Sequence, residues 1–211
     1  MLFDRFTSLD AVGPYQVLAG LPNSKVTFVA AAAEIVTDDL GSCSLVAERS
    51  IEELTNPDVL VVPGGPGQVS LMNDEVVLSW IRNAHLTTTW TASVCTGSLI
   101  LGAAGILEGK KATSHWLALD QLQGFGATPT SERVVIDGKV ITAAGVSAGI
   151  DMAFTLAAKV AGPEVAQIIQ LAIEYDPEPP FDGGSPDKAL PALRQYLESR
   201  SRFILEGKES A

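Results

Sequence analysis

The chain has 211 residues and a mass of 22.1 kDa; 46% of the residues are apolar and 18% are charged, a balance that supports a large core and excludes intrinsic disorder. Acidic residues outnumber basic ones by 25 to 14, which gives a formal charge of −11. Nucleic acid needs a basic protein face and an anionic membrane surface attracts cationic helices, so neither is an expected partner.

The hydropathy pattern favours a cytoplasmic protein. Mean hydropathy is +0.24, yet the longest apolar runs, Val26–Val36 and Leu99–Leu107, fall short of the roughly 18 residues of a membrane-spanning helix. The first residues lack the basic and apolar regions of a secretory signal. Cys43 and Cys95 are too few to stabilise this length by disulfides, so we expect a reducing compartment.

Short β-branched runs alternate with helical patterns along the chain, which predicts a parallel sheet covered by helices. In chain order we expect helix Asp10–Ala19, strands Val26–Ala30 and Val59–Val62, helix Asp74–His85, strand Thr88–Val94, helices Thr96–Leu107 and His115–Gln123, strands Arg133–Ile136 and Lys139–Thr142, and helices Ala148–Val160, Pro163–Tyr175 and Lys188–Leu205. The predicted fold is α/β: a flavodoxin-like three-layer sandwich with a mostly parallel sheet and helices on both faces.

Three further features describe the organisation of the chain. Asp137-Gly138 is a hairpin signal that predicts an antiparallel pair. The proline- and glycine-rich segment Asp176–Asp187 cannot be helical, so we predict one domain over 1–211, with 176–211 as a C-terminal arm and helix. Only Met1–Phe3 precede the first turn, so the first strand is either very short or starts upstream of this sequence.

Two strand ends carry residues suited to a ligand site, which in open α/β sheets lies beyond the carboxyl ends of the strands. Val59–Val62 runs into Pro63-Gly64-Gly65-Pro66-Gly67, where glycines either leave backbone N–H groups accessible to a ligand or form a plain tight turn. The second strand end is Val94-Cys95-Thr96-Gly97, where a strand changes into a helical pattern.

Cys95 is predicted to lie on a nucleophile elbow, directly before a helix N-terminus. The partial positive charge of that terminus favours a thiolate and a reactive sulfur. The alternative is a buried apolar filler, because free cysteine is among the most buried residues. Cys43 follows a turn-like Gly41-Ser42 and is interpreted as structural or incidental.

Possible partners for this sulfur are few. His85 ends a polar helix and is interpreted as a solvated residue; no histidine follows His115, so a glutamine-amidotransferase triad, whose histidine lies near the carboxyl end, cannot be assembled. Asp10 could reach the same edge of the sheet as Cys95. Its position also suits a helix N-cap, and the residues alone favour that interpretation.

Together these residues resemble the ThiJ/PfpI superfamily, which shares its fold with class I glutamine amidotransferases. The resemblance spans the whole chain, and within the superfamily it is greatest to the bacterial isocyanide (isonitrile) hydratases. It rests on Phe6–Pro14, Val61–Gly65, Ser93–Gly97, Ala112–Trp116, Gly145–Asp151, Gln170–Pro177 and Pro179–Phe181.

The details of the motifs narrow the implied function. Thr96 stands where PfpI-type peptidases and glyoxalase-like members have histidine, and Asp10 stands where many members have glutamate, as it does in isocyanide hydratases. The amidase-like domain of AraC-type regulators has a similar pattern, but a DNA-binding region of their kind is not found after residue 188.

The resemblance implies a role for each matching residue. Cys95 would be the nucleophile, Asp10 its carboxyl partner and Thr96 a positioning group. Backbone amides of Gly64, Gly65 and Thr96 would polarise the substrate. The apolar side chains Trp116, Val146 and Phe181 would form the pocket wall, and His115 would support the site structurally. The thiolate would add to the terminal carbon of R–N≡C to give a thioimidate, which water converts to an N-substituted formamide. Asp10 could donate the proton and then activate water if burial raises its pKa above about 3.9.

Alternative functions remain at this point. Cys95 could be an oxidisable sensor in a non-enzymatic stress-response protein, or the nucleophile of another cysteine-dependent hydrolase or a glyoxalase-like enzyme. We expect no metal, because the histidines and cysteines are unclustered, and no nucleotide cofactor, because phosphate-binding glycine loops are missing. The expected partner is a small-molecule substrate, and relatives suggest a homodimer.

Overall fold

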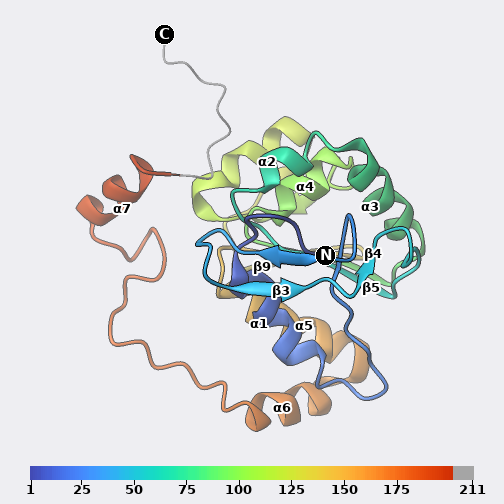
Figure 1. Cartoon of the computed structure of the whole chain (residues 1–211). Coiled ribbons are helices and arrows are strands. Elements are labelled where there is room, and N and C mark those ends of the chain that lie inside the picture. Colours follow the sequence, from blue (N-terminus) through green and yellow to red (C-terminus); the bar gives the residue numbers. More distant parts are fainter. Residues whose placement is uncertain (202–211) are drawn as a thin grey trace.

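A four-stranded sheet runs through the middle of the protein (Figure 1). The computed structural model describes residues 1–201. The strand order is β5-β6-β10-β9, with the first three strands parallel and β9 antiparallel to β10. The strands are β5 (Val59–Val62), β6 (Trp90–Val94), β9 (Val134–Asp137) and β10 (Val140–Ala143). The predicted parallel sheet and the hairpin at Asp137-Gly138 are both confirmed.

Helices cover both faces of this sheet, as Figure 1 shows. The helices α1, α5 and α6 lie on one face, and α2, α3, α4 and the 3₁₀ helix η1 lie on the other. Their bounds are α1 (Ser8–Leu18), α2 (Gln68–Leu71), α3 (Glu75–Thr87), α4 (Gly97–Ala103), η1 (Trp116–Phe125), α5 (Ala148–Ala161) and α6 (Pro163–Ala172). The chain thus has the predicted α/β architecture.

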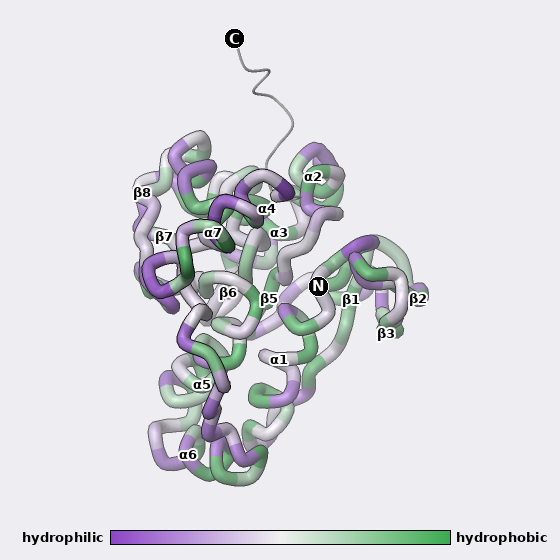
Figure 2. Tube along the Cα trace, turned by 90° about the vertical axis from the view of Figure 1, so that its left-hand side faces the viewer, coloured by the Kyte–Doolittle hydropathy of each residue, from purple (hydrophilic) through white to green (hydrophobic). Residues whose placement is uncertain are grey.

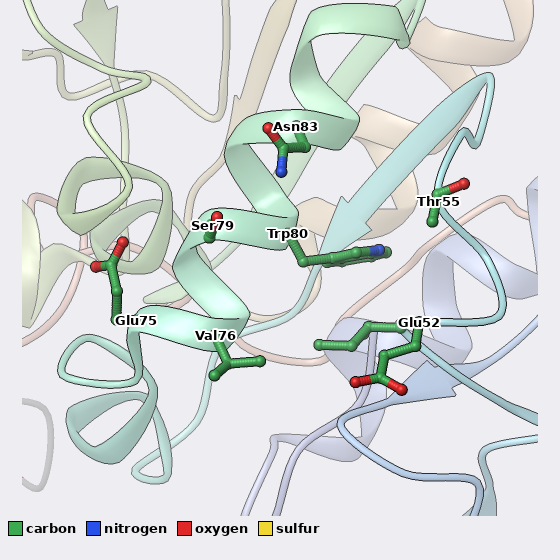
Figure 3. A pocket seen from close by; sticks show the side chains of 8 residues that line it. Glu52, Thr55, Glu75, Val76, Ser79, Trp80 and Asn83 are labelled. Atoms are coloured by element: carbon green, nitrogen blue, oxygen red, sulfur yellow. The ribbon is translucent and has the colours of Figure 1, made fainter.

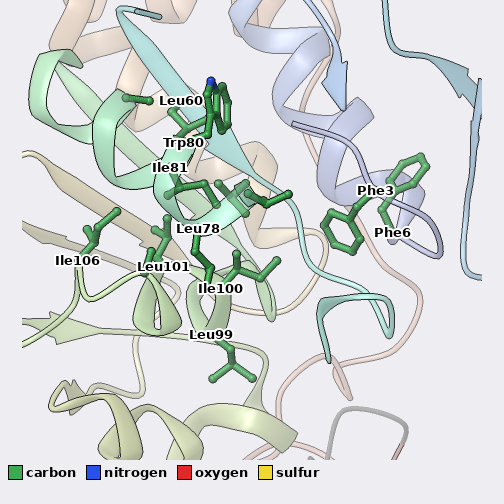
Figure 4. Packing of buried hydrophobic residues seen from close by; sticks show 14 of the residues in the cluster. Phe3, Phe6, Leu60, Leu78, Trp80, Ile81, Leu99, Ile100, Leu101 and Ile106 are labelled. Carbon is green, nitrogen blue, oxygen red and sulfur yellow. The ribbon is translucent and has the colours of Figure 1, made fainter. Parts of the chain in front are cut away.

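The core is divided between the two faces of the sheet. One cluster joins residues 2–6 to α3, α4 and η1, with Ile81 and Ile100 fully buried between the elements (Figure 4). The other joins α1, α5 and α6 to β6 and β10, with Met152 and Leu156 fully buried. The trace in Figure 2 is accordingly hydrophobic along β5, which lies between the two clusters.

Residues 1–3 extend the sheet beyond β5. The Met1 ammonium donates to the Val61 carbonyl at 2.8 Å, and the Leu2 N–H donates to the Val29 carbonyl at 2.6 Å. This segment therefore lies between β5 and β1. The sequence patterns miss several short pairings: β1 (Val29–Ala30) with β4 (Arg49–Ser50), β2 (Ile35–Thr37) with β3 (Ser44–Val46), and β7 (Lys111–Ala112) with β8 (Thr128–Pro129). Two- and three-residue strands are too short to carry a periodic signal.

Several predicted boundaries are corrected. The helix after Cys95 ends at Ala103 rather than Leu107, because Gly105 takes a left-handed conformation (φ +78°) and turns the chain. The helix predicted at His115–Gln123 is a 3₁₀ helix. The strand predicted at Val26–Ala30 retains only Val29 and Ala30 in a ladder.

The segment after α6 leaves the rest of the molecule. It has no helix or strand until α7 (Pro191–Glu198), and Figure 1 shows it running around the outside to α7, which stands apart from the other helices. The irregular segment Asp176–Asp187 is thereby confirmed. The predicted last helix, Lys188–Leu205, begins later, at Pro191, and its final residues lie outside the described part of the chain. None of the helices in residues 1–201 is long and apolar enough to span a membrane.

Candidate active site

Cys95 occupies a sharp corner between β6 and α4. Its φ of +57° is left-handed, which is uncommon for a residue with a side chain and typical of strained functional positions. The Cys95 N–H is shared between the carbonyls of Ala143 and Ala144, both at 3.1 Å. The predicted elbow is therefore present.

The carbonyl of Cys95 is fixed from two directions. The hydroxyl groups of Ser98 and Ser114 each donate to it at 3.1 Å. Ser98 follows in the first turn of α4, and Ser114 comes from the segment before η1. The sequence patterns miss both residues: Ser98 has a local signal in its spacing from the cysteine, whereas Ser114 arrives only through the tertiary fold.

Asp10 and Cys95 form a buried pair. Both residues are fully shielded from solvent, and the charge of the Asp10 carboxyl acts on the Cys95 thiol. Asp10 Oδ2 also accepts the Gly64 N–H at 2.9 Å. Asp10 is the third residue of α1, and the N-cap position belongs to Thr7. The N-cap interpretation of Asp10 is therefore wrong.

Burial changes the proton affinities of this pair. It raises the pKa of Asp10 from its ordinary 3.8 to about 7, although hydrogen bonds from Gly64 and Cys95 act in the opposite direction. The negative charge of Asp39 also raises the pKa of Asp10. Asp39 is a neighbour that the sequence patterns miss.

The thiol is affected in the same way. Burial, followed by the charge of Asp10, raises the pKa of Cys95 well above its usual value; the N–H groups of Thr96 and Val146 and the Thr96 hydroxyl lower it. The expectation that the helix N-terminus favours a free thiolate is thus corrected, because desolvation exceeds the effect of the nearby N–H groups. Thiol and carboxyl instead compete for the same proton.

The glycine turn packs directly against this pair. A Cβ on Gly64 would lie 2.5 Å from the Thr96 nitrogen and 3.0 Å from Asp10 Oδ2, and Gly65 has φ +134°. The Gly65 N–H donates to Thr96 Oγ1 at 3.0 Å. Only glycine permits this approach of two backbones.

The three predicted backbone donors all have partners within the protein. The Gly64 N–H is bound to Asp10, the Gly65 N–H is bound to the Thr96 hydroxyl, and the Thr96 N–H faces the Cys95 sulfur. The Gly64 N–H holds the acid, so a role as a polarising donor would require it to release Asp10. The backbone N–H groups of Gly65 and Thr96 likewise have partners within the protein.

Of the other predicted site residues, Val146 adjoins Cys95, whereas Phe181 lies away from it. Val146 adjoins the site, with its N–H toward Cys95 and a left-handed φ of +33°. His115 Nδ1 accepts the Leu117 N–H at 3.2 Å, and its ring lies against Gly145. Trp116 stacks on His115 at 6.0 Å between ring centroids. Phe181, in contrast, is 83% exposed in the arm, so a single chain does not bring it to the site.

A separate groove of about 440 Å³ lies along α3 (Figure 3). Trp80 and Val76 form its apolar floor, and the carboxylates of Glu52 and Glu75 lie at its sides. None of its lining residues belongs to the surroundings of Cys95. Within residues 1–201, no three His, Cys, Asp or Glu side chains are grouped to hold a metal ion.

The chain is similar to proteins of one known family along most of its length. The DJ-1/PfpI family matches residues 1–159. An isonitrile hydratase from Pseudomonas putida is 47% identical over 201 residues, covering 95% of this chain and 88% of that protein.

Solved structures give the same result. A THiJ/PfpI family protein from Pseudomonas syringae superposes with a TM-score of 0.92 at 38% identity, covering 94% of this chain and 83% of the other. DJ-1beta from Drosophila melanogaster shares the fold with a TM-score of 0.73 at 23% identity, covering 81% and 93%.

Proposed function

The chain belongs to the DJ-1/PfpI family, and from that premise we propose that it is a cofactor-independent hydro-lyase that hydrates isocyanides (isonitriles) to N-substituted formamides. The observation that carries this proposal is the buried Asp10–Cys95 pair at the elbow, a carboxyl and a thiol whose pKa values are both raised by burial. The identity of 47% with the Pseudomonas putida isonitrile hydratase supports the same substrate class.

The first half of the reaction uses the pair as nucleophile and proton relay. The Cys95 sulfur attacks the terminal carbon of R–N≡C while its proton passes to the Asp10 carboxylate. Asp10 then delivers this proton to the same carbon. The product is a thioimidate, R–N=CH–S–Cys95, and Asp10 is again a carboxylate.

The second half regenerates the enzyme. Asp10 accepts a proton from water as the water oxygen bonds to the thioimidate carbon, and the imine nitrogen takes that proton. The tetrahedral carbon then forms its C=O bond and releases the sulfur, which recovers a proton from the hydroxyl group. The sum is R–N≡C plus water giving R–NH–CHO, with no redox change and no cofactor.

The substrate must displace contacts to reach the sulfur, because Cys95 is fully buried. The isocyano group is linear and narrow, which suits a shielded nucleophile. Trp116 and Val146 are both partly exposed and form the proposed wall nearest the elbow. Rotation of the Thr96 hydroxyl would free the Gly65 N–H to polarise the intermediate.

The proposal includes a homodimer and a cytoplasmic location. Leu193, Tyr196 and Leu197 of α7 are all about half exposed, and Phe181 is more exposed still. A short helix with such an apolar face is marginal alone, and a second copy would cover it and could bring Phe181 to the site. Cys43 and Cys95 are free thiols, which suits a reducing compartment. Light scattering tests the dimer, and a monomer mass would contradict it.

The decisive experiment follows the loss of isonitrile absorbance over a panel of aliphatic and aromatic isonitriles. Purified protein is expected to consume them and to form the formamide. Cys95→Ala and Asp10→Ala are expected to abolish the activity, whereas Cys43→Ala serves as a matched control that retains it. Absence of turnover on the whole panel would refute the proposal.

The structure favours this function over the alternatives. Oxidation of cysteine follows thiolate character and exposure, and the buried Cys95, with its raised pKa, has little of either. Mass spectrometry after mild peroxide treatment tests the sensor alternative directly. Thr96 beside the sulfur, in place of a histidine, counts against glyoxalase-like chemistry, which Cys95-dependent consumption of methylglyoxal would support.

A further inference from the structure

A polar network lies at the N-terminus of α5. Asp151, in the first turn of the helix, forms an ion pair with the Arg133 guanidinium through Oδ2. Its other oxygen, Oδ1, accepts the Tyr175 hydroxyl at 2.8 Å. Arg133 also donates from Nη2 to the Ser147 hydroxyl at 3.2 Å. Both oxygens of the Asp151 carboxylate are therefore used.

This network joins three segments that are distant in the sequence. Arg133 directly precedes β9, Ser147 is the N-cap residue of α5, and Tyr175 follows α6 where the chain leaves for the arm. The Tyr175 ring packs on Phe154 of α5, with ring centroids 5.4 Å apart. The start of α5 is thus held from the sheet on one side and from the arm junction on the other.

The residue before Ser147 connects this helix end to the sulfur. Val146 has φ +33°, a strained value for a β-branched residue, and its N–H faces the Cys95 sulfur. Strained residues persist only where the surrounding structure fixes them. On the other side, Gly149 packs so closely against Val94 that an added Cβ would lie 2.9 Å away.

We propose that Arg133, Asp151 and Tyr175 are positioning residues for Cys95. They hold Ser147 and the first turn of α5 in place, and so keep the Val146 N–H against the sulfur that it stabilises as a thiolate. The inference deepens the proposed function, on which it rests for turnover but not for thiol reactivity.

Because the network is partly exposed, it is expected to position the turn beside Cys95 rather than to stabilise the whole fold. The Arg133 and Asp151 side chains are 52% and 31% exposed, and ion pairs of this kind contribute little to folding. Loss of one member should therefore loosen the turn without unfolding the protein. The titratable group that faces the thiol directly is Asp10, and His115 lies behind Gly145; neither is changed by the test.

The test measures alkylation of Cys95 by iodoacetamide as a function of pH in a Cys43→Ala background, with mass spectrometry identifying the modified residue. Asp151→Asn and Tyr175→Phe are expected to shift the profile to higher pH and to slow alkylation about three- to tenfold at neutral pH, since a charge-assisted hydrogen bond to the sulfur is weakened. On isonitrile, kcat should fall and KM should stay nearly constant.

Two control variants remove similar groups at sites away from the network. Tyr15→Phe removes a partly exposed hydroxyl on α1, and Arg194→Gln breaks an exposed ion pair with Glu198 in α7; both should leave the profile unchanged. If Asp151→Asn folds poorly, Tyr175→Phe, which removes one hydroxyl, still decides the question.

The inference would be overturned if the alkylation profiles of both variants superpose on that of the parent. A lowered Tm together with such unchanged profiles would indicate a structural role alone. Failure of isonitrile turnover with shifted alkylation profiles would refute the proposed function and leave the positioning role intact. A parent sulfur that is unreactive at every pH would refute both.

Discussion

The Asp10 carboxyl and the Cys95 thiol lie in a space that solvent does not reach, close enough for the charge of Asp10 to raise the pKa of Cys95. Asp10 comes from the first turn of α1 and Cys95 from the corner after β6, and Gly64 packs closely against Asp10 and against Thr96, the residue after Cys95. Burial raises the pKa of both groups, and the charge of Asp10 raises the pKa of Cys95 further, whereas Cys95 lowers the pKa of Asp10. The protonation of one group therefore affects the pKa of the other.

The first prediction concerns the pH dependence of hydration. The reactive form holds one proton between the two groups, so Asp10 must lose its own proton before the sulfur attacks. With the pKa of Asp10 at about 7, kcat/KM should rise with pH through a midpoint near that value. Steady-state rates from acidic to alkaline buffers measure the profile. A flat profile across neutral pH would contradict the single-proton mechanism.

The second prediction concerns stability. The folded-state pKa of Asp10 is raised, so its contribution is most favourable below 3.8 and is lost as the pH rises toward about 7. An ionised Asp10 then costs up to about 4 kcal/mol. Asp10→Asn, which keeps an acceptor for the Gly64 N–H, should raise Tm at alkaline pH and lose this advantage in acid. Calorimetry at both pH values checks the sign, and an equal Tm difference at both would contradict it.

The third prediction concerns the glycine turn. Gly64→Ala places a methyl group 2.5 Å from the Thr96 nitrogen, which must push the turn away from Asp10 and the elbow. Because small displacements at a reacting centre are costly, activity should fall by about a hundredfold or more. Gly124→Ala is the matched control, since no atom lies within 4 Å of its Cβ position. Comparable activity in the two variants would contradict the packing argument.

The fourth prediction separates the Thr96 hydroxyl from its methyl group. Thr96→Val retains the shape but leaves the buried Gly65 N–H without its acceptor at 3.0 Å, at a cost of about 1–3 kcal/mol. Thr96→Ser retains the oxygen and should stay close to the parent in both Tm and kcat. Urea unfolding and initial rates measure the two effects. Equal behaviour of the Val and Ser variants would show that the hydroxyl is dispensable.

Part of this site follows from local sequence alone. The change from an apolar strand to helical spacing around Cys95 predicts the elbow, and the strand Val59–Val62 is observed with its predicted bounds. The early end of α4 is harder to predict, because the left-handed Gly105 stands inside an apolar run that resembles continuing helix. The short outer strands carry too few residues for any period to appear.

The sequence by itself determined the layered α/β fold, the corner at Cys95 and the chemical identity of the thiol and the acid, because strand alternation, helix period and turn residues are properties of neighbouring residues. Only the tertiary structure decided that Asp10 lies beside Cys95 rather than capping its own helix, and that the Gly64 N–H binds the acid. It also decided that burial raises the pKa of the Cys95 thiol, against the effect expected of a helix N-terminus. These outcomes depend on desolvation and on backbone groups brought together from separate strands, and no local pattern encodes either.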